Sequence, residues 1–109
     1  MNIEAFPKTF LKSYIKHPKR DCVILVNERA TYQEIYERSI QVAKSLSALG
    51  VTRGERVGIL MPNSLDFVIS LMGTAFIGAI PTLYNGRFKT REIAHVTSDA
   101  SIKTILTSD

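Results

Sequence analysis

Arg56-Val-Gly-Ile-Leu-Met-Pro-Asn-Ser64 and the apolar segment that follows it, as far as Asn85, decide the fold of this chain. A short apolar run ends at Pro62, an apolar run of helix length spans residues 65–76, and a second short apolar run follows Gly78. This order predicts a β-α-β unit, which generally implies a parallel sheet. Because the helix is apolar nearly all round, we expect more than one neighbour to enclose it.

The turn before this helix has the features of a structural cap. Pro62 ends the strand, Asn63 or Ser64 caps the helix, and Asp66 complements its positive end. Helix N-termini after parallel strands are natural anion sites, but this turn lacks the glycines that let a pyrophosphate approach the backbone. The sequence therefore favours structural capping over a phosphate site.

Three glycines in this unit have structural interpretations. Gly58 lies inside the first strand, where the absent side chain permits a close approach by a neighbouring element. Gly73 and Gly78 have Gly-x-x-x-x-Gly spacing, but Ala79-Ile80 follows them and the motif ends a helix instead of opening one. It is not a P-loop, and we interpret both glycines as small residues that pack against another helix.

The segments before the central unit predict a hairpin and a long helix. Residues 22–26 form a strand that turns at Asn27-Glu28 into a second strand at residues 30–32. Thr31-Tyr-Gln-Glu34 has the spacing of a capping box, which begins a helix with a broad apolar face that includes Leu49. Gly50 terminates that helix in a left-handed conformation.

After the central unit, residues 85–89 predict a loop, Thr90 opens a short helix, and residues 102–107 predict another buried strand. The order from Thr31 onward is α-β-α-β-α-β. The predicted fold class is α/β, as part of a doubly wound, mainly parallel sheet with helices on both faces, plus a small N-terminal hairpin.

Residues 1–20 form a basic amphipathic helix that we separate from the α/β subdomain at residues 21–109. Its apolar residues recur at helical spacing, and Lys8, Lys12 and Lys16 lie four apart on another face. One interpretation is attachment to an anionic membrane surface. The other is a terminal helix docked on the domain with its lysines in water. Peripheral membrane contact is therefore one of two alternatives.

Composition narrows the function classes. The formal charge of +4 comes from residues 1–20, since the remaining residues carry nine basic and nine acidic groups. A nucleic-acid partner is not expected, because no groove-like spread of basic residues with interleaved aromatic residues occurs. The longest uncharged run is too short in its helical part to span a bilayer, and the N-terminal residues lack the pattern of a secretory signal, so we expect a cytoplasmic location.

Reactive side chains are few. Cys22, the only cysteine, lies in an apolar strand and is interpreted as a buried thiol in a reducing compartment. His17 and His95 fall in different elements with no third metal ligand near either, and no Gly-x-Ser-x-Gly elbow occurs. We assign no catalytic, cofactor-binding or metal-binding residue to this chain.

The sequence of three segments resembles that of the adenylate-forming (AMP-binding) enzymes, and most closely the N-terminal part of an acyl-CoA synthetase or fatty acid–CoA ligase. These segments are Thr31-Tyr-Gln-Glu-Ile35, residues 48–64 and Gly73-Thr-Ala-Phe-Ile-Gly-Ala-Ile-Pro-Thr82. The likeness covers nearly the whole chain. Further residues of the family's loop and helix are Asn85, Arg87, Thr90, Glu92, Ile93, Ser98 and Asp99.

The resemblance implies that ATP activates a carboxylic acid, with a fatty acid as the expected class, to an acyl-adenylate whose acyl group passes to coenzyme A, with Mg²⁺ accompanying ATP. The family's phosphate loop, ribose-binding acid and catalytic lysine all lie beyond its first hundred or so residues. We therefore expect a scaffold segment of a larger ligase that is inactive alone and self-associates through exposed edges. Alternatives are a fragment of a non-ribosomal peptide synthetase adenylation domain and a free-standing module that binds a protein or a membrane.

Overall fold

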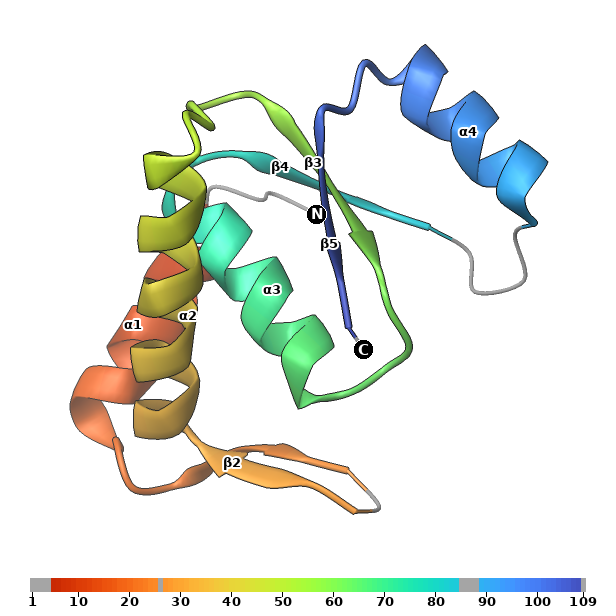
Figure 1. Cartoon of the computed structure of the whole chain (residues 1–109). Helices are drawn as coiled ribbons and strands as arrows, with labels where there is room; N and C mark the ends of the chain where they lie inside the picture. Colours follow the sequence, from red (N-terminus) through yellow and green to blue (C-terminus); the bar gives the residue numbers. More distant parts are fainter. Residues whose placement is uncertain (1–4, 26, 85–88, 109) are drawn as a thin grey trace.

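The computed structural model describes residues 5–25, 27–84 and 89–108, as a three-stranded parallel sheet with helices around it and a two-stranded antiparallel hairpin (Figure 1). The elements in chain order are α1 (Ala5–Lys16), β1 (Asp21–Ile24), β2 (Arg29–Thr31), α2 (Tyr32–Ala48), β3 (Arg56–Leu60), α3 (Leu65–Phe76), β4 (Ile80–Leu83), α4 (Thr90–Asp99) and β5 (Thr104–Thr107). The predicted order from Thr31 onward is confirmed. The predicted loop at residues 85–88, with Asn85 and Arg87, lies outside the described residues.

The sheet has the strand order β4-β3-β5, and β3 pairs in parallel with both neighbours. Val57 of β3 is opposite Pro81 on one side and Thr104 on the other. The chain leaves β3 through α3 to reach β4 and then crosses back through α4 to β5. Because such connections are right-handed, α3 and α4 lie on opposite faces of the sheet (Figure 1). The predicted α/β class with helices on both faces is confirmed.

Helix α3 begins and ends at the predicted residues, and α2 packs closely along it. This close packing depends on Gly73. A Cβ atom built there would lie 2.7 Å from the Val42 Cβ and 2.8 Å from the Ser39 carbonyl oxygen, both in α2. The interpretation of Gly73 as a small residue that packs against another helix is confirmed.

The core consists of two clusters of buried apolar residues. One joins α1, the hairpin, α2 and α3, and its buried members are Phe10, Ala30, Ile35, Leu65, Ile69 and Met72. The other joins the end of α2 to the sheet, and its buried members are Leu46, Val51, Val57 and Ala79. Since Phe10 belongs to the first cluster, α1 docks on the domain, as one of the two sequence interpretations expects.

Both ends of α2 follow the sequence prediction. The Glu34 backbone N–H donates to Thr31 Oγ1 at 3.2 Å, and the Thr31 backbone N–H donates to Glu34 Oε1 at 3.2 Å, which together make a capping box. Gly50 has a φ of 91°, the left-handed conformation that ends the helix. However, the placement of Leu49 on the apolar face is wrong, because α2 ends at Ala48 and 73% of the surface of Leu49, its C-cap, is exposed.

Two other sequence interpretations need correction. Gly78 does not pack against a helix: it follows α3 with a φ of 74°, and a Cβ there would lie 2.9 Å from the Arg53 Cγ in the preceding turn. Position 78 is therefore one that only glycine fits easily. The last strand, β5, is shorter than predicted. Its residues alternate between half-buried and exposed, because α4 covers little of its face of the sheet.

Gly58 has the predicted role of permitting a close approach. A Cβ atom there would lie 2.7 Å from Tyr84 Cε2, so the Tyr84 ring crosses β3 at this point. The Tyr84 hydroxyl shares a hydrogen bond with the Thr97 hydroxyl of α4. The Arg56 guanidinium donates to the Ala100 carbonyl oxygen at 3.2 Å. These contacts attach α4 to the sheet.

Candidate functional site

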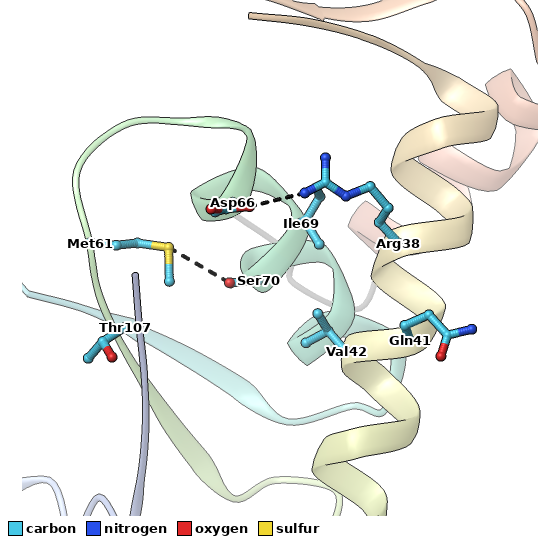
Figure 2. Close-up of a pocket in the computed structure, with 8 residues that line it drawn as sticks. All are labelled: Arg38, Gln41, Val42, Met61, Asp66, Ile69, Ser70 and Thr107. Atoms are coloured by element: carbon cyan, nitrogen blue, oxygen red, sulfur yellow. Dashed lines mark hydrogen bonds and ion pairs between the residues drawn. The ribbon is translucent and has the colours of Figure 1, made fainter. Parts of the chain in front are cut away.

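The carboxyl ends of β3 and β5 meet the N-terminus of α3 at one edge of the sheet. From β3 the chain first adds a strand on one side and then on the other, so this edge is a topological switch point. Open α/β sheets bind ligands in the crevice outside the carboxyl ends of the strands at such a point. A pocket of about 310 Å³ opens there between α2, the start of α3, Met61 and Thr107 (Figure 2). It is the candidate functional site.

An ion pair closes one side of this pocket. The Arg38 guanidinium reaches from α2 to Asp66 in the first turn of α3, with 3.1 Å between the nitrogen and the carboxylate oxygen (Figure 2). Both side chains are more than half exposed, so the pair contributes only about 0–1 kcal/mol to stability. Because the two charges cancel, this pair does not attract a phosphate. Arg38 is exposed on the outer face of α2, and no spacing in the sequence indicates its pairing with Asp66.

The N-terminus of α3 is occupied by the protein itself. The Phe67 backbone N–H donates to Ser64 Oγ at 3.1 Å, and the Leu65 backbone N–H donates to Glu28 Oε1 of the hairpin turn at 3.3 Å. These N–H groups are the ones that a bound anion uses at a helix N-terminus. Two carboxylates, Glu28 and Asp66, lie beside them and repel anions. The predicted structural cap is confirmed, with Ser64 as the cap.

The remaining polar groups of the pocket show no activated nucleophile. The Ser70 hydroxyl is 3.8 Å from the Met61 sulfur, which is a weak acceptor (Figure 2). The histidines lie elsewhere: His95 pairs with Asp99 on the surface of α4, 3.1 Å apart, and His17 is exposed. In the described part of the chain, no three His, Cys, Asp or Glu side chains form a group that could hold a metal ion. The polar side chains that line the pocket are the Arg38–Asp66 ion pair and the uncharged Gln41, Ser70 and Thr107.

Cys22 differs from its prediction, because the thiol is only half-buried. The hairpin lies at the margin of the domain, packed on α2 by one side, so its other side faces solvent. Burial nevertheless raises the pKa of the Cys22 thiol above its ordinary value, and a hydrogen bond with Tyr32 acts in the opposite direction.

Cys22 is expected to react slowly with Ellman's reagent at pH 7. Because the raised pKa lowers the thiolate fraction, the rate at neutral pH should fall below that of glutathione and should rise steeply as the pH approaches the thiol pKa. The measurement is the pseudo-first-order rate from pH 7 to 10, with the urea-unfolded chain as the control. A rate at pH 7 equal to that of the unfolded chain would show that burial does not protect the thiol.

Ser39 is a buried residue that the sequence analysis did not single out. It is fully buried, and its hydroxyl has no hydrogen-bond partner in the described part of the chain. Ser39 lies where α2 approaches Gly73 of α3, a place that only a small side chain fits. The sequence signal that could have indicated its burial is its spacing: Ser39 is a small residue four positions before Ala43 on the same helix, and Ala43 is buried.

Replacing Ser39 with alanine is therefore expected to raise the free energy of unfolding by about 1 kcal/mol, because it removes an unsatisfied buried hydroxyl without a large cavity. Urea denaturation of the two proteins checks this. Ser47→Ala, which alters an exposed serine of the same helix, is the control and should change stability by less than about 0.5 kcal/mol. Destabilisation by Ser39→Ala would mean that the hydroxyl has a partner.

With this geometry established, sequence comparison identifies the family. A family profile described as AMP-binding enzyme matches residues 10–109. The chain belongs to the AMP-binding enzyme family. The 2-succinylbenzoate–CoA ligase of Bacillus cereus is 26% identical over 105 residues, which are 96% of this chain and 22% of the relative.

Solved structures agree with this AMP-binding assignment. A Mycobacterium tuberculosis fatty acyl CoA synthetase superposes with a TM-score of 0.87 at 26% identity, over 96% of this chain and 21% of the other. An artificially fused adenylation–PCP di-domain of a non-ribosomal peptide synthetase from Klebsiella oxytoca superposes with a TM-score of 0.87 at 25% identity, over 94% and 20%. The chain thus spans about a fifth of the length of these relatives.

No helix of the described segments is long and apolar enough to cross a bilayer.

Proposed function

We propose that the complete protein is an ATP-dependent acid–thiol ligase. A carboxylate oxygen attacks the α-phosphorus of ATP, pyrophosphate leaves, and an acyl-adenylate forms. The sulfur of coenzyme A then attacks the acyl carbon and AMP leaves. The observation that carries this proposal is the family match over residues 10–109, together with relatives that are themselves CoA ligases.

In this proposal the chain is framework. The N-terminal N–H groups of α3 that a phosphate would use are occupied by Ser64 and Glu28, and the Arg38–Asp66 pair leaves the pocket neutral. Mg²⁺ accompanies ATP in such a reaction, and the described residues contain no cluster suited to it. We therefore assign ATP, Mg²⁺ and coenzyme A to the remainder of the protein, and we propose that this chain alone is inactive.

A fatty acid is the proposed substrate class, because a fatty acyl CoA synthetase superposes on nearly the whole chain. The proposed location is the cytoplasm, where ATP and coenzyme A are available. A second candidate is an adenylation domain that passes its acyl group to a carrier-protein thiol, which the likeness to the Klebsiella oxytoca di-domain favours.

The experiment is to incubate the complete protein with ATP, Mg²⁺, a panel of fatty and aryl acids and coenzyme A, and to analyse the products by mass spectrometry. The ligase predicts acyl-CoA, AMP and pyrophosphate in equal amounts. Acyl-AMP that persists with coenzyme A present would favour the adenylation-domain candidate. ADP with inorganic phosphate, or no acid-dependent consumption of ATP, would contradict both.

A third candidate is a free-standing module that keeps the scaffold without catalysis. The reading frame after Asp109 distinguishes this module from a ligase segment. A stop codon directly after Asp109 would favour the module, whereas a continuation into a Gly/Ser/Thr-rich loop would eliminate it. As a separate chain, the protein is proposed to self-associate, because Leu83 of β4 and Ile105 of β5 expose apolar side chains on strands with unpaired edges. Light scattering that shows a monomer at high concentration would contradict this.

A further inference from the structure

The outer face of α1 presents a row of lysines with an isoleucine among them. Lys8, Lys12 and Lys16 are exposed and follow one another at a spacing of four. Ile15 comes three residues after Lys12, and 76% of its surface is exposed. Residues three and four apart share a helix face, so Ile15 lies on the face that carries these lysines. We call these four residues the lysine face.

The opposite face of α1 is fixed in the core by aromatic contacts. The ring of Phe10 lies 5.6 Å from that of Tyr32 and 6.0 Å from that of Phe76, measured between centroids. Tyr14 stacks on Tyr36 at 4.3 Å. These contacts determine the rotation of the helix about its axis, so the lysine face stays directed outward.

The positive charge of this region is not neutralised within the described part of the chain. The ion pairs there join Arg29 to Asp21, Arg38 to Asp66 and His95 to Asp99, and none involves the lysine face or the two basic residues that follow α1. Five of the six charged residues at positions 1–20 are basic, whereas the rest of the chain is balanced. The net charge of +4 therefore resides at this end of the molecule and complements a negatively charged surface.

We propose that the lysine face docks on an anionic membrane surface, with the lysines at the lipid headgroups and Ile15 inserted among them. Clusters of lysines on a helix bind anionic lipid surfaces, and an exposed aliphatic side chain among them adds apolar area that the bilayer can bury. A nucleic acid fits less well, because Phe10 and Tyr14, the aromatic side chains that α1 is shown to place, pack in the core and cannot stack on bases. The proposal does not depend on the ligase function.

The attraction is weak enough for reversible binding. Each lysine near an anionic bilayer raises the partition coefficient roughly fivefold, so three lysines supply about a hundredfold. Screening by salt acts over about 10 Å at 0.1 M and about 3 Å at 1 M, so this attraction should disappear at high salt.

The test is sedimentation of the complete protein with vesicles of phosphatidylcholine alone or with 30% phosphatidylglycerol, in 0.05 M and 0.5 M NaCl. Wild type should bind only the anionic vesicles and only at low salt. The triple variant K8E/K12E/K16E should lose binding by a factor of about 100 or more, whereas K8R/K12R/K16R, which keeps the charge, should bind as wild type does. Ile15→Ser should weaken binding severalfold and leave the salt dependence unchanged.

Circular dichroism and thermal melts of each variant show whether the fold is retained. Equal binding of K8E/K12E/K16E and wild type, binding to neutral vesicles, or no binding by folded wild type would overturn the proposal. The last outcome would mean that the rest of the protein covers this face. Binding to single-stranded RNA without binding to anionic vesicles would also overturn it and would assign the face to nucleic acid.

Discussion

Replacing Gly73 with valine is expected to lower the free energy of unfolding by about 3 kcal/mol. A Cβ atom at Gly73 lies 2.7 Å from the Val42 Cβ and 2.8 Å from the Ser39 carbonyl oxygen, distances that side chains do not tolerate. The Ser39 oxygen is backbone and cannot rotate away, so α2 and α3 must separate along their whole contact. Urea denaturation followed by circular dichroism measures the loss.

A double-mutant cycle identifies the cause. Val42→Ala removes the Val42 Cγ1, one of the three atoms that would lie within 3.0 Å of a Cβ at Gly73, so the double variant should be more stable than the sum of the two single changes indicates, by about 1 kcal/mol. Ala94→Val, on an exposed position of α4, is the matched control for placing valine in a helix. Equal stability of Gly73→Val and Ala94→Val would show that the two helices do not approach as closely as described.

Replacing Ile35 with alanine is expected to lower the free energy of unfolding by about 3 kcal/mol and the melting temperature by more than about 10 °C. None of its surface is exposed, and it belongs to the cluster that joins α1, the hairpin, α2 and α3. The truncation removes apolar contacts and leaves a cavity among four elements that cannot all collapse into it. Differential scanning calorimetry gives the shift.

Ile15→Ala is the matched control, since it makes the same truncation where 76% of the side chain is exposed. It should change stability by less than about 0.5 kcal/mol. If Ile35→Ala were as mild as Ile15→Ala, Ile35 would not be part of the core, and the docking of α1 through this cluster would be wrong.

The parts of the fold that the sequence predicts correctly are those that local chemistry determines. The bounds of α3 follow from Pro62, the Ser64 cap and the end of the apolar run, and the start of α2 follows from the Thr31–Glu34 capping box. The parallel sheet follows from the β-α-β order alone. These features depend on residues that are adjacent in sequence, so tertiary structure has little opportunity to override them.

The features that the sequence did not predict depend on distant parts of the chain. Arg38 finds Asp66 across 28 residues, which no helical spacing indicates. Leu49 has the right period for the apolar face of α2, but the chain leaves the core before it. Cys22 lies in an apolar run, but its strand is only half-buried, since the hairpin packs on one side among the described residues. In each case the tertiary structure determines which neighbours the residue has.

The candidate site was only partly predictable. The cap at Ser64 came from residue types, but the contribution of Glu28 to the N-terminus of α3 required the hairpin to fold back on it. The switch point between β3 and β5 requires the strand order, which the sequence suggested only through its alternation of strands and helices. Family resemblance supplied the proposed reaction, which no residue in this chain identifies by its chemistry.

We propose that this chain is framework in a ligase whose chemistry resides in the rest of the protein. The most direct measurement is acid-dependent exchange of labelled pyrophosphate into ATP, by the complete protein and by residues 1–109 alone, with the same panel of carboxylic acids. We expect exchange by the complete protein and none by the chain alone. Exchange by the chain alone, or its absence from the complete protein with every acid, would contradict it.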